Sequence, residues 1–311
     1  MPTRIDTSGV PESFTRFPVR IHDEEPRIAL GSATATKTFQ HFTKASRTHS
    51  SGPYGNVCAM SYPEGDAERV KMCAEILEMF WIYDDVIESL PHDAASEEHN
   101  VVIRLLDRKN GDQDSALDAD SISTPFQDVG PRMHALDPVG APFVLSILKQ
   151  FLREYDSSSM KFDTWEECLP FRVLNVAFRM MDALLQWTIG VYLSPEETEL
   201  CSAFYMSAAR TLGLTNDYFS WNMEQRRPTD RSCSTVPVVM KQYGMSERDA
   251  LIFVKGLAVD AEETTMKLAI PLKELSSNVK EYVEGMEHLL GANCFWSATA
   301  PRYADLSDVE E

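Results

Sequence analysis

Apolar side chains recur at helical spacing along most of this chain, and no stretch keeps the strict alternation that indicates a β-strand. One helix is predicted to begin near Asp66 and to end before Pro91, because a proline disfavours helical geometry in the residue that precedes it. Its apolar stripe consists of Val70, Cys73, Leu77, Phe80 and Trp81. A helix of this length with a continuous apolar stripe is typical of a buried core element.

A second long helix is predicted to begin at Ser194, where Pro195 occupies the first helical position and Glu197 completes a capping box, and to stop at Pro228. Another helix starts at 163–166, and we expect Pro170 to break it because proline removes a backbone donor. A kink or boundary is expected at Pro271, and Gly291 fits a helix C-cap. Further helical patterns cover 28–48, 100–106, 143–155, 246–258 and 262–290. The predicted fold class is all-α, in one domain covering 1–311 and without internal repeats.

Three segments lack sustained periodicity. We expect 1–26 to be loop or partly ordered tail, 107–140 to be a long acidic loop, and 305–311 to be an acidic tail. The aspartates of the second segment do not complete the ligand pattern of a calcium-binding loop, so a solvated acidic loop is the better interpretation.

Two carboxylates extend the apolar stripe of the first long helix. Asp84 and Glu88 stand four residues apart, on the face that already carries Leu77 and Phe80. Ionised acids on an apolar surface repel each other and lose hydration unless a cation joins them. Magnesium suits such a pair, because it accepts one or two carboxylates and completes its octahedron with water and phosphate oxygens. A solvated turn at the helix end is the alternative interpretation.

A matching set of oxygen ligands lies on the second long helix. Asn216, Ser220 and Glu224 also stand four residues apart and present an amide oxygen, a hydroxyl and a carboxylate on one face. That face continues a stripe of small and apolar residues, which include Ala209 and Gly213, so the polar groups need partners. We predict metal ligation by Asp84, Asn216, Ser220 and Glu224.

With these motifs the sequence resembles the class I terpene synthases. Asp84 to Glu88 matches the family's aspartate-rich DDxxE motif, and Asn216 to Glu224 matches its NDxxSxxxE triad. Arg302 and Tyr303 resemble the C-terminal RY motif, and Arg172 stands where the diphosphate-sensing arginine is expected. The opening of the chain and the residues inside the triad are most similar to the cyclase domains of fungal bifunctional di- and sesterterpene synthases.

The resemblance implies a helical bundle around a central active-site cavity, in which a linear isoprenoid diphosphate is ionised and the carbocation is cyclised to a polycyclic terpene. A cluster of about three magnesium ions is expected when diphosphate is bound. The residues implied in catalysis are Asp84, Arg172, Asn216, Ser220, Glu224, Arg302 and Tyr303. Arg179 is the rival to Arg172 as the sensor, and Asp85 or Glu88 is expected to orient Arg172.

The same resemblance implies diphosphate contacts from Arg172, Asn216, Arg302 and Tyr303, with Asp85 and Glu88 beside them. Aromatic faces stabilise cations without attacking them. The candidate cavity aromatics are Phe80, Trp81, Trp187, Phe219 and Trp296, for each of which ordinary core packing is the alternative. The chain departs from many relatives at Met223, where they carry a basic residue that contacts diphosphate.

The implied substrate is a C20 geranylgeranyl or C25 geranylfarnesyl diphosphate. The alternatives are a sesquiterpene cyclase acting on farnesyl diphosphate and a catalytically silent helical interaction module. A chain-elongating prenyltransferase is disfavoured, because it needs a second aspartate-rich motif where this chain has Asn216 to Glu224. In the fungal bifunctional relatives a prenyltransferase domain follows the cyclase, and this chain ends at Glu311, so an excised domain and a stand-alone enzyme are both open. Homo-oligomerisation is also open.

Composition limits the partners of the protein. The chain of 311 residues has a formal net charge of −19 and a pI near 4.8, which disfavours nucleic acid. An anionic diphosphate would also be repelled unless metal ions and a few arginines reverse the field locally. The six cysteines lack CxxC spacing and are expected to be buried free thiols. No leader and no apolar run long enough to span a bilayer is present, so the sequence predicts a cytoplasmic protein.

Overall fold

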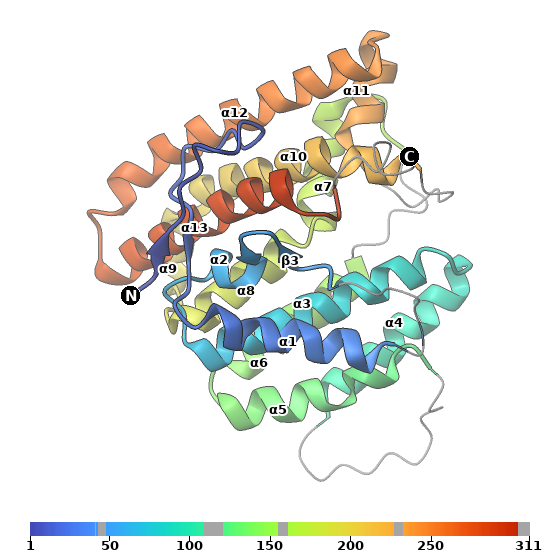
Figure 1. Ribbon diagram of the computed structural model, residues 1–311, viewed down its shortest axis with the longest axis vertical. Helices are drawn as coiled ribbons and strands as arrows, with labels where there is room; N and C mark the ends of the chain where they lie inside the picture. Colours follow the sequence, from blue (N-terminus) through green and yellow to red (C-terminus); the bar gives the residue numbers. More distant parts are fainter. Residues whose placement is uncertain (41, 43–47, 109–120, 155–160, 227–232, 304–311) are drawn as a thin grey trace.

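The computed structural model describes residues 1–40, 42, 48–108, 121–154, 161–226 and 233–303, and its described part is predominantly helical (Figure 1). The predicted all-α class is confirmed. The helices are α1 (Glu25–Thr38), α2 (Val57–Ser61), α3 (Ala67–Ile87), α4 (His92–Leu106), α5 (Val129–Leu136), α6 (Ala141–Glu154), α7 (Trp165–Asn175), α8 (Phe178–Ile189), α9 (Pro195–Leu200), α10 (Ser202–Glu224), α11 (Thr235–Tyr243), α12 (Glu247–Leu272) and α13 (Ser277–Thr299). A short 3₁₀ helix, η1, covers Thr124–Asp128. None of the described helices is long and apolar enough to cross a membrane.

The two short β-structures are hairpin-like and small. β1 (Thr3–Arg4) pairs antiparallel with β2 (Arg20–Ile21), and β3 (Ser51–Gly52) pairs antiparallel with β4 (Gly55–Asn56). The segment between β1 and β2 is mostly loop, as expected, yet it packs on the bundle with Val10, Phe17 and Val19 buried. Figure 1 shows this blue segment crossing α12 and α13.

α3 and α10 lie in different halves of the bundle (Figure 1), where α1 covers α3 and both α12 and α13 pack against α10. α3 begins at Asp66, whose carboxylate caps the backbone N–H groups of Glu68 and Arg69, in agreement with the sequence prediction. The predicted capping box is also present, with Ser194 and Glu197 bonded reciprocally. α3 and α9 therefore begin where local capping chemistry specifies, whereas α10 begins after Cys201 without a side-chain cap.

Several predicted boundaries were wrong. The expected single helix from Ser194 is divided at Cys201 into α9 and α10, and Pro228, its expected stop, lies outside the described residues. α1 ends at Thr38 instead of reaching 48. α12 continues through 259–261, where two helices were expected. The predicted boundary at Pro271 is confirmed to within one residue, because α12 ends at Leu272.

Gly291 is not a C-cap, because α13 continues through it to Thr299. A Cβ on this glycine would lie 2.9 Å from the carbonyl oxygen of Pro18. The glycine is therefore explained by close packing of the N-terminal segment on α13, and not by helix termination.

The acidic segment 107–140 is not a single loop. Its residues 124–136 form η1 and α5, with Phe126, Val129 and Met133 buried at helical spacing. The prolines and glycines in this stretch hid that spacing from the sequence analysis. The aspartates at 112–120 and the predicted tail 305–311 lie outside the described residues.

Candidate active site

One cavity joins the motifs that the sequence placed far apart. Its volume is about 210 Å³, and its walls come from α3, the junction of α7 with α8, α10, α13 and the segment after α13. The polar lining residues are Ser61, Asp84, Glu88, Arg172, Asn175, Asn216, Ser220, Glu224, Cys233, Asn293, Arg302 and Tyr303. The rest of the lining is mainly apolar or aromatic, so the cavity has a polar side and a hydrocarbon-like side.

The acidic motif of α3 faces this cavity from the helix end. Asp84 and Glu88 both line it, and Glu88 is the C-cap residue of α3. Both are half-buried, and the helix dipole disfavours acids at this end of α3. The site is therefore arranged to gain from a bound cation.

α10 brings the second motif to the opposite wall. Asn216, Ser220 and Glu224 line the cavity together, as the spacing of four predicted. Ser220 is 1% exposed, and its Oγ has no hydrogen-bond partner among the described residues. Leaving a buried hydroxyl unpaired costs about 1 to 3 kcal/mol, so this oxygen is ready to accept a ligand.

These residues fit a magnesium site that is completed by its substrate. Asp84 and Glu224 supply carboxylates, and Asn216 and Ser220 supply neutral oxygens, which is a hard donor set. Among the described residues no group of three His, Cys, Asp or Glu side chains is close enough to hold a metal alone. Magnesium bound here would thus depend on water and phosphate oxygens for its remaining ligands.

Arg172 is buried at the base of the polar side, where three partners hold it. Its Nε donates to Asp217 Oδ1 at 2.6 Å, Nη1 donates to Asn175 Oδ1 at 2.6 Å, and Nη2 donates to Asn216 Oδ1. Burial alone would lower the pKa of Arg172, but Asp217 and Glu224 raise it above its ordinary value. The guanidinium is therefore permanently charged and aimed at the amide oxygen expected to bind metal.

The expectation that Asp85 or Glu88 orients Arg172 finds no support among the bonds of its guanidinium, where Asp217 takes that place. Asp217 Oδ2 also accepts bonds from the backbone N–H and Oγ1 of Thr235, at the start of α11. Asp217 follows Asn216 by one residue, which rotates it about 100° around α10, away from the cavity and toward α7. The sequence does not reveal the role of Asp217, because that role depends on the neighbouring helix α7.

The chain is broken beside Arg172, but not at Pro170. α7 continues through the proline to Asn175, and the break comes at Ala177, which has a left-handed backbone conformation with φ of 60°. This conformation is unfavourable for a residue with a Cβ. Asn175, Val176 and Ala177 line the cavity, so the strained junction forms part of its wall. Arg179, the rival sensor, is exposed on α8 and does not line the cavity.

The segment after α13 closes the polar side. Arg302 Nη2 and Nη1 donate to Asp85 Oδ1 and Oδ2 at 3.1 and 3.3 Å, and Tyr303 accepts a bond from Asn216 Nδ2 at 3.3 Å. Burial would lower the pKa of Arg302, but Asp85 raises it, and burial raises the pKa of Tyr303. Both side chains keep their protons available for donation to an anionic ligand.

Three of the five candidate aromatics line the cavity. Trp81 and Trp296 stack with ring centroids 5.6 Å apart and an interplanar angle of 12°, and Phe80 lines the cavity as well. Trp187 does not line the cavity: it is fully buried and donates to Asp137. Phe219 does not line it either, because it stacks on Phe14 of the N-terminal segment. Both had been placed by their sequence neighbourhood, which does not fix the direction of a side chain on a helix.

Met223 is one of the residues that line the cavity. Met223 faces the cavity, so the basic residue that many relatives carry there is replaced by an apolar contact. Arg226, one turn further on, is exposed and does not line the cavity. The positive charges of the cavity wall within the described residues are therefore Arg172 and Arg302.

A family model described as terpene synthase family 2, C-terminal metal binding, matches residues 75–264, more than half of the chain. A bifunctional terpene synthase of Fusarium proliferatum is 27% identical over 93% of this chain and 40% of its own length. Preterpestacin I synthase of Cochliobolus heterostrophus is 28% identical over 95% of this chain and 44% of its own length. A sesterterpene synthase of Colletotrichum orbiculare is 26% identical over 96% of this chain and 44% of its own length. The chain thus spans less than half the length of these curated relatives.

Solved structures support the same fold. Aristolochene synthase of Penicillium roqueforti superposes with a TM-score of 0.74 at 20% identity, covering 92% of this chain and 98% of that protein. Wild-type cucumene synthase superposes with a TM-score of 0.72 at 12% identity, covering 91% of this chain and 99% of that protein. At these identities the similarity concerns the fold, which is the helical bundle expected from the motifs.

Proposed function

The chain belongs to terpene synthase family 2, and we propose that it is a magnesium-dependent terpene cyclase. In this proposal it ionises a linear isoprenoid diphosphate, closes the carbocation into a polycyclic terpene and releases diphosphate. The fungal relatives, which are named as terpene and sesterterpene synthases, support the same class of reaction.

One observation carries the proposal. Asp84 and Glu88 on α3 share a single cavity with Asn216, Ser220 and Glu224 on α10, and Arg172 and Arg302 enter the same polar side. Two facing sets of oxygen ligands with two buried guanidinium groups match the needs of a diphosphate held through metal ions. The apolar remainder of the cavity matches the hydrocarbon chain.

The chain's own residues would bind and orient the leaving group. Arg172, Arg302 and Tyr303 would donate hydrogen bonds to diphosphate oxygens, and Arg172 would exchange its bond to Asn216 for one to diphosphate. Magnesium ions, about three when diphosphate is bound, would neutralise the charge that develops on the departing oxygen. Preplaced positive charge of this kind lowers the barrier to breaking the carbon–oxygen bond.

The apolar side would protect the cation that remains. The stacked Trp81 and Trp296 present aromatic faces, and Phe80 extends that wall toward Leu77. Aromatic faces attract a cation by about 0.5 to 2 kcal/mol each and do not add to it. Exclusion of water from this wall would let the cation rearrange before it loses a proton.

We propose a C20 or C25 diphosphate as substrate, supported by the relative named as a sesterterpene synthase, a term for C25 terpenes. The C15 farnesyl diphosphate is the competing substrate. A prenyltransferase domain that supplies the diphosphate is proposed as the partner, supported by the relative named as bifunctional.

The test is to incubate the purified protein with the C10, C15, C20 and C25 diphosphates, with and without magnesium, and to analyse the extracted products by gas chromatography and mass spectrometry. A cyclised product from the C20 or C25 substrate that requires magnesium is expected. A cyclised product from the C15 diphosphate alone would show that the proposed substrate is wrong, but it would still support the proposed class of reaction. If no substrate reacts while magnesium and inorganic pyrophosphate still bind, the protein is a silent module and the proposal is wrong.

A further inference from the structure

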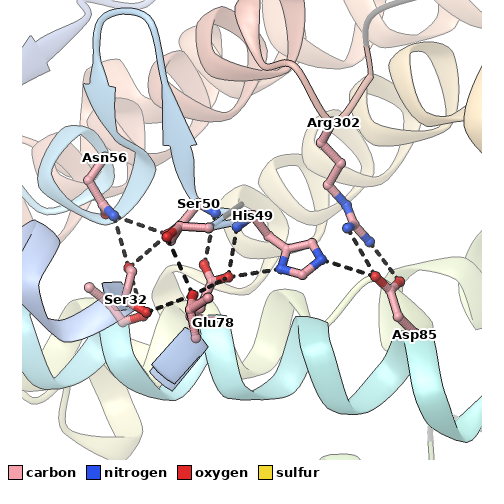
Figure 2. A network of polar contacts seen from close by, with 10 residues as sticks. Ser32, His49, Ser50, Asn56, Glu78, Asp85 and Arg302 are labelled. Carbon is pink, nitrogen blue, oxygen red and sulfur yellow. Dashed lines mark hydrogen bonds and ion pairs between the residues drawn. The ribbon is translucent and has the colours of Figure 1, made fainter. Parts of the chain in front are cut away.

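A buried carboxylate lies two helical turns before the acidic motif of α3. Glu78 has a side chain that is 0% exposed, and it shares a face of α3 with Asp85, seven residues later (Figure 2). Its Oε1 accepts the backbone N–H of His49 at 2.7 Å, and its Oε2 accepts that of Ser50 at 2.9 Å. Burial opposes the charged form, but these bonds and His49 lower the pKa of Glu78, so it is held as a carboxylate.

His49 connects this carboxylate with the active site. Its Nδ1 lies 2.8 Å from Glu78 Oε1, and its Nε2 lies 3.1 Å from Asp85 Oδ2. Carboxylate oxygens only accept hydrogen bonds, so both ring nitrogens must donate, which only the imidazolium form can do. The geometry therefore describes a doubly bonded histidine cation, only 11% exposed, between two acids.

Asp85 is shared between His49 and Arg302. Its Oδ2 is bonded both by His49 Nε2 and by Arg302 Nη1, while Oδ1 is bonded by Arg302 Nη2 (Figure 2). Charges thus alternate along Glu78, His49, Asp85 and Arg302. Arg302 lines the cavity, and its Nε is buried without a partner among the described residues. The last member of the series therefore has bonding capacity left for a ligand.

The backbone that carries His49 is firmly held. Ser50 Oγ donates to Ser32 Oγ at 2.7 Å, and Asn56 Nδ2 donates to Ser32 Oγ and Ser50 Oγ at 2.9 and 3.0 Å. All three side chains are 0% exposed (Figure 2). This cluster fixes the β3–β4 hairpin on α1, so His49 reaches Asp85 from an anchored position.

We propose that His49 is a positioning residue that lets Arg302 turn from Asp85 to the diphosphate of the substrate. This inference rests on the proposed function of the cavity. A partly buried carboxylate that loses a bidentate arginine is left uncompensated, which penalises the turn. His49 remains bonded to Asp85 throughout and reduces that penalty, and Glu78 keeps His49 charged and oriented. Without the imidazolium, Arg302 stays on Asp85 and stabilises the leaving group less.

The first experiment compares His49→Gln with His288→Gln. His288 is also a buried histidine, 8% exposed, but it does not line the cavity. For His49→Gln we expect kcat to fall by about tenfold to a hundredfold with KM changed by less than about threefold, because the loss concerns the departing diphosphate. His288→Gln should keep kcat within about twofold of wild type. Equal kinetics for the two variants would overturn the inference.

The second experiment needs no variant. Asp85 and Glu78 raise the pKa of His49 against the effects of burial and of Arg302, so the imidazolium is present below that raised pKa and is lost as pH rises through it. Wild-type kcat should therefore fall on the alkaline side, and His49→Gln should lack this limb. Wild-type kcat that stays flat there would contradict the inference even if His49→Gln does not fold.

Glu78→Gln supplies a third arm. If Glu78 acts through His49, the double variant His49→Gln/Glu78→Gln should lose no more kcat than the worse single variant, since both substitutions remove the same interaction with Asp85. Additive losses would assign Glu78 a separate structural role and overturn its place in the proposal. A wild-type protein without turnover on any diphosphate would instead refute the proposed function, so the two failures are distinguishable.

Discussion

Arg172 and Asp217 form an ion pair in which Nε and Oδ1 are 2.6 Å apart and the side chains are 5% and 0% exposed. Asp217 also bonds Thr235 at the start of α11, so a single carboxylate joins α7, α10 and α11 behind the cavity. The charge aimed at the ligand is thus fixed by a residue that does not touch the ligand.

Replacing Asp217 with Asn should destabilise the protein, because it leaves the buried guanidinium of Arg172 uncompensated. Removing one partner of a buried ion pair costs about 3 kcal/mol or more. We expect the free energy of unfolding to fall by this amount, as measured by urea denaturation. The matched control is Asp163→Asn, whose pair with Lys241 is solvent-exposed at 85% and 69%. The free energy of unfolding of Asp163→Asn should fall by less than about 1 kcal/mol. Equal losses for the two variants would show that the Asp217 pair is not buried in solution.

Glu224→Gln should lower kcat by about a hundredfold to a thousandfold, because a neutral amide is a much weaker magnesium ligand than a carboxylate. Steady-state kinetics at saturating magnesium test this. Glu199→Gln on α9 is the control, since Glu199 is exposed and far from the cavity lining. Full turnover by Glu224→Gln would remove the basis for the metal site on α10.

Trp81→Leu should change the product profile, because the stacked pair of Trp81 and Trp296 forms part of the cavity wall. The stability cost should be of the order of the stacking energy, about 0.5 to 1.5 kcal/mol. Trp187→Phe is the counterpart: it deletes the bond to Asp137 and shrinks a fully buried side chain, which costs about 1 to 3 kcal/mol, yet it leaves the product profile unchanged. Product analysis by mass spectrometry and thermal melting separate the two, and a product shift in Trp187→Phe would contradict its placement outside the cavity.

Cys233 should be the first cysteine to react with iodoacetamide. It is half-buried and lines the cavity, and its hydrogen bond with Cys168 lowers the pKa of Cys233 while raising that of Cys168. The thiolate is the reactive form. Burial raises the pKa of the remaining thiols, which are Cys58, Cys73, Cys201 and Cys294. Peptide mapping after partial alkylation checks the order, and loss of turnover should accompany modification in wild type but not in Cys233→Ala.

Asp182 should make stability fall as pH rises. Burial raises the pKa of this carboxyl from 3.8 to about 6, although Tyr282 and Gln186 bond it. A folded-state pKa above the unfolded one gives stability that is present below 3.8 and lost as pH rises through about 6, by about 3 kcal/mol in total. Urea denaturation of wild type and Asp182→Asn at pH 4 and pH 8 should show wild type losing most of that amount relative to the variant. A difference between the two proteins that does not change with pH would contradict the shifted pKa.

The starts of α3 and α9 could be predicted from sequence because they depend on neighbours within one turn. The Asp66 cap and the Ser194 capping box use only local side chains and backbone groups. The ligand spacing in both motifs is equally local, since residues four apart on a helix share a face whatever surrounds them. Hence the sequence could predict that Asp84 shares a face with Glu88, and Asn216 with Ser220 and Glu224, while metal ligation by these residues stays a prediction.

The hydrogen-bond partners of the side chains, and the directions in which the side chains point, were decided by the tertiary structure. Asp85 bonds Arg302 instead of Arg172, and Trp187 faces Asp137 instead of the cavity, because each choice depends on which helix packs alongside. Gly291 is likewise explained by the N-terminal segment that packs closely on α13, a contact between segments distant in sequence. The sequence by itself determined which oxygens and charges each helix carries. Only the packing of the bundle decided their partners, because a side chain's partner is set by the helices that lie against it, and local periodicity contains no information about them.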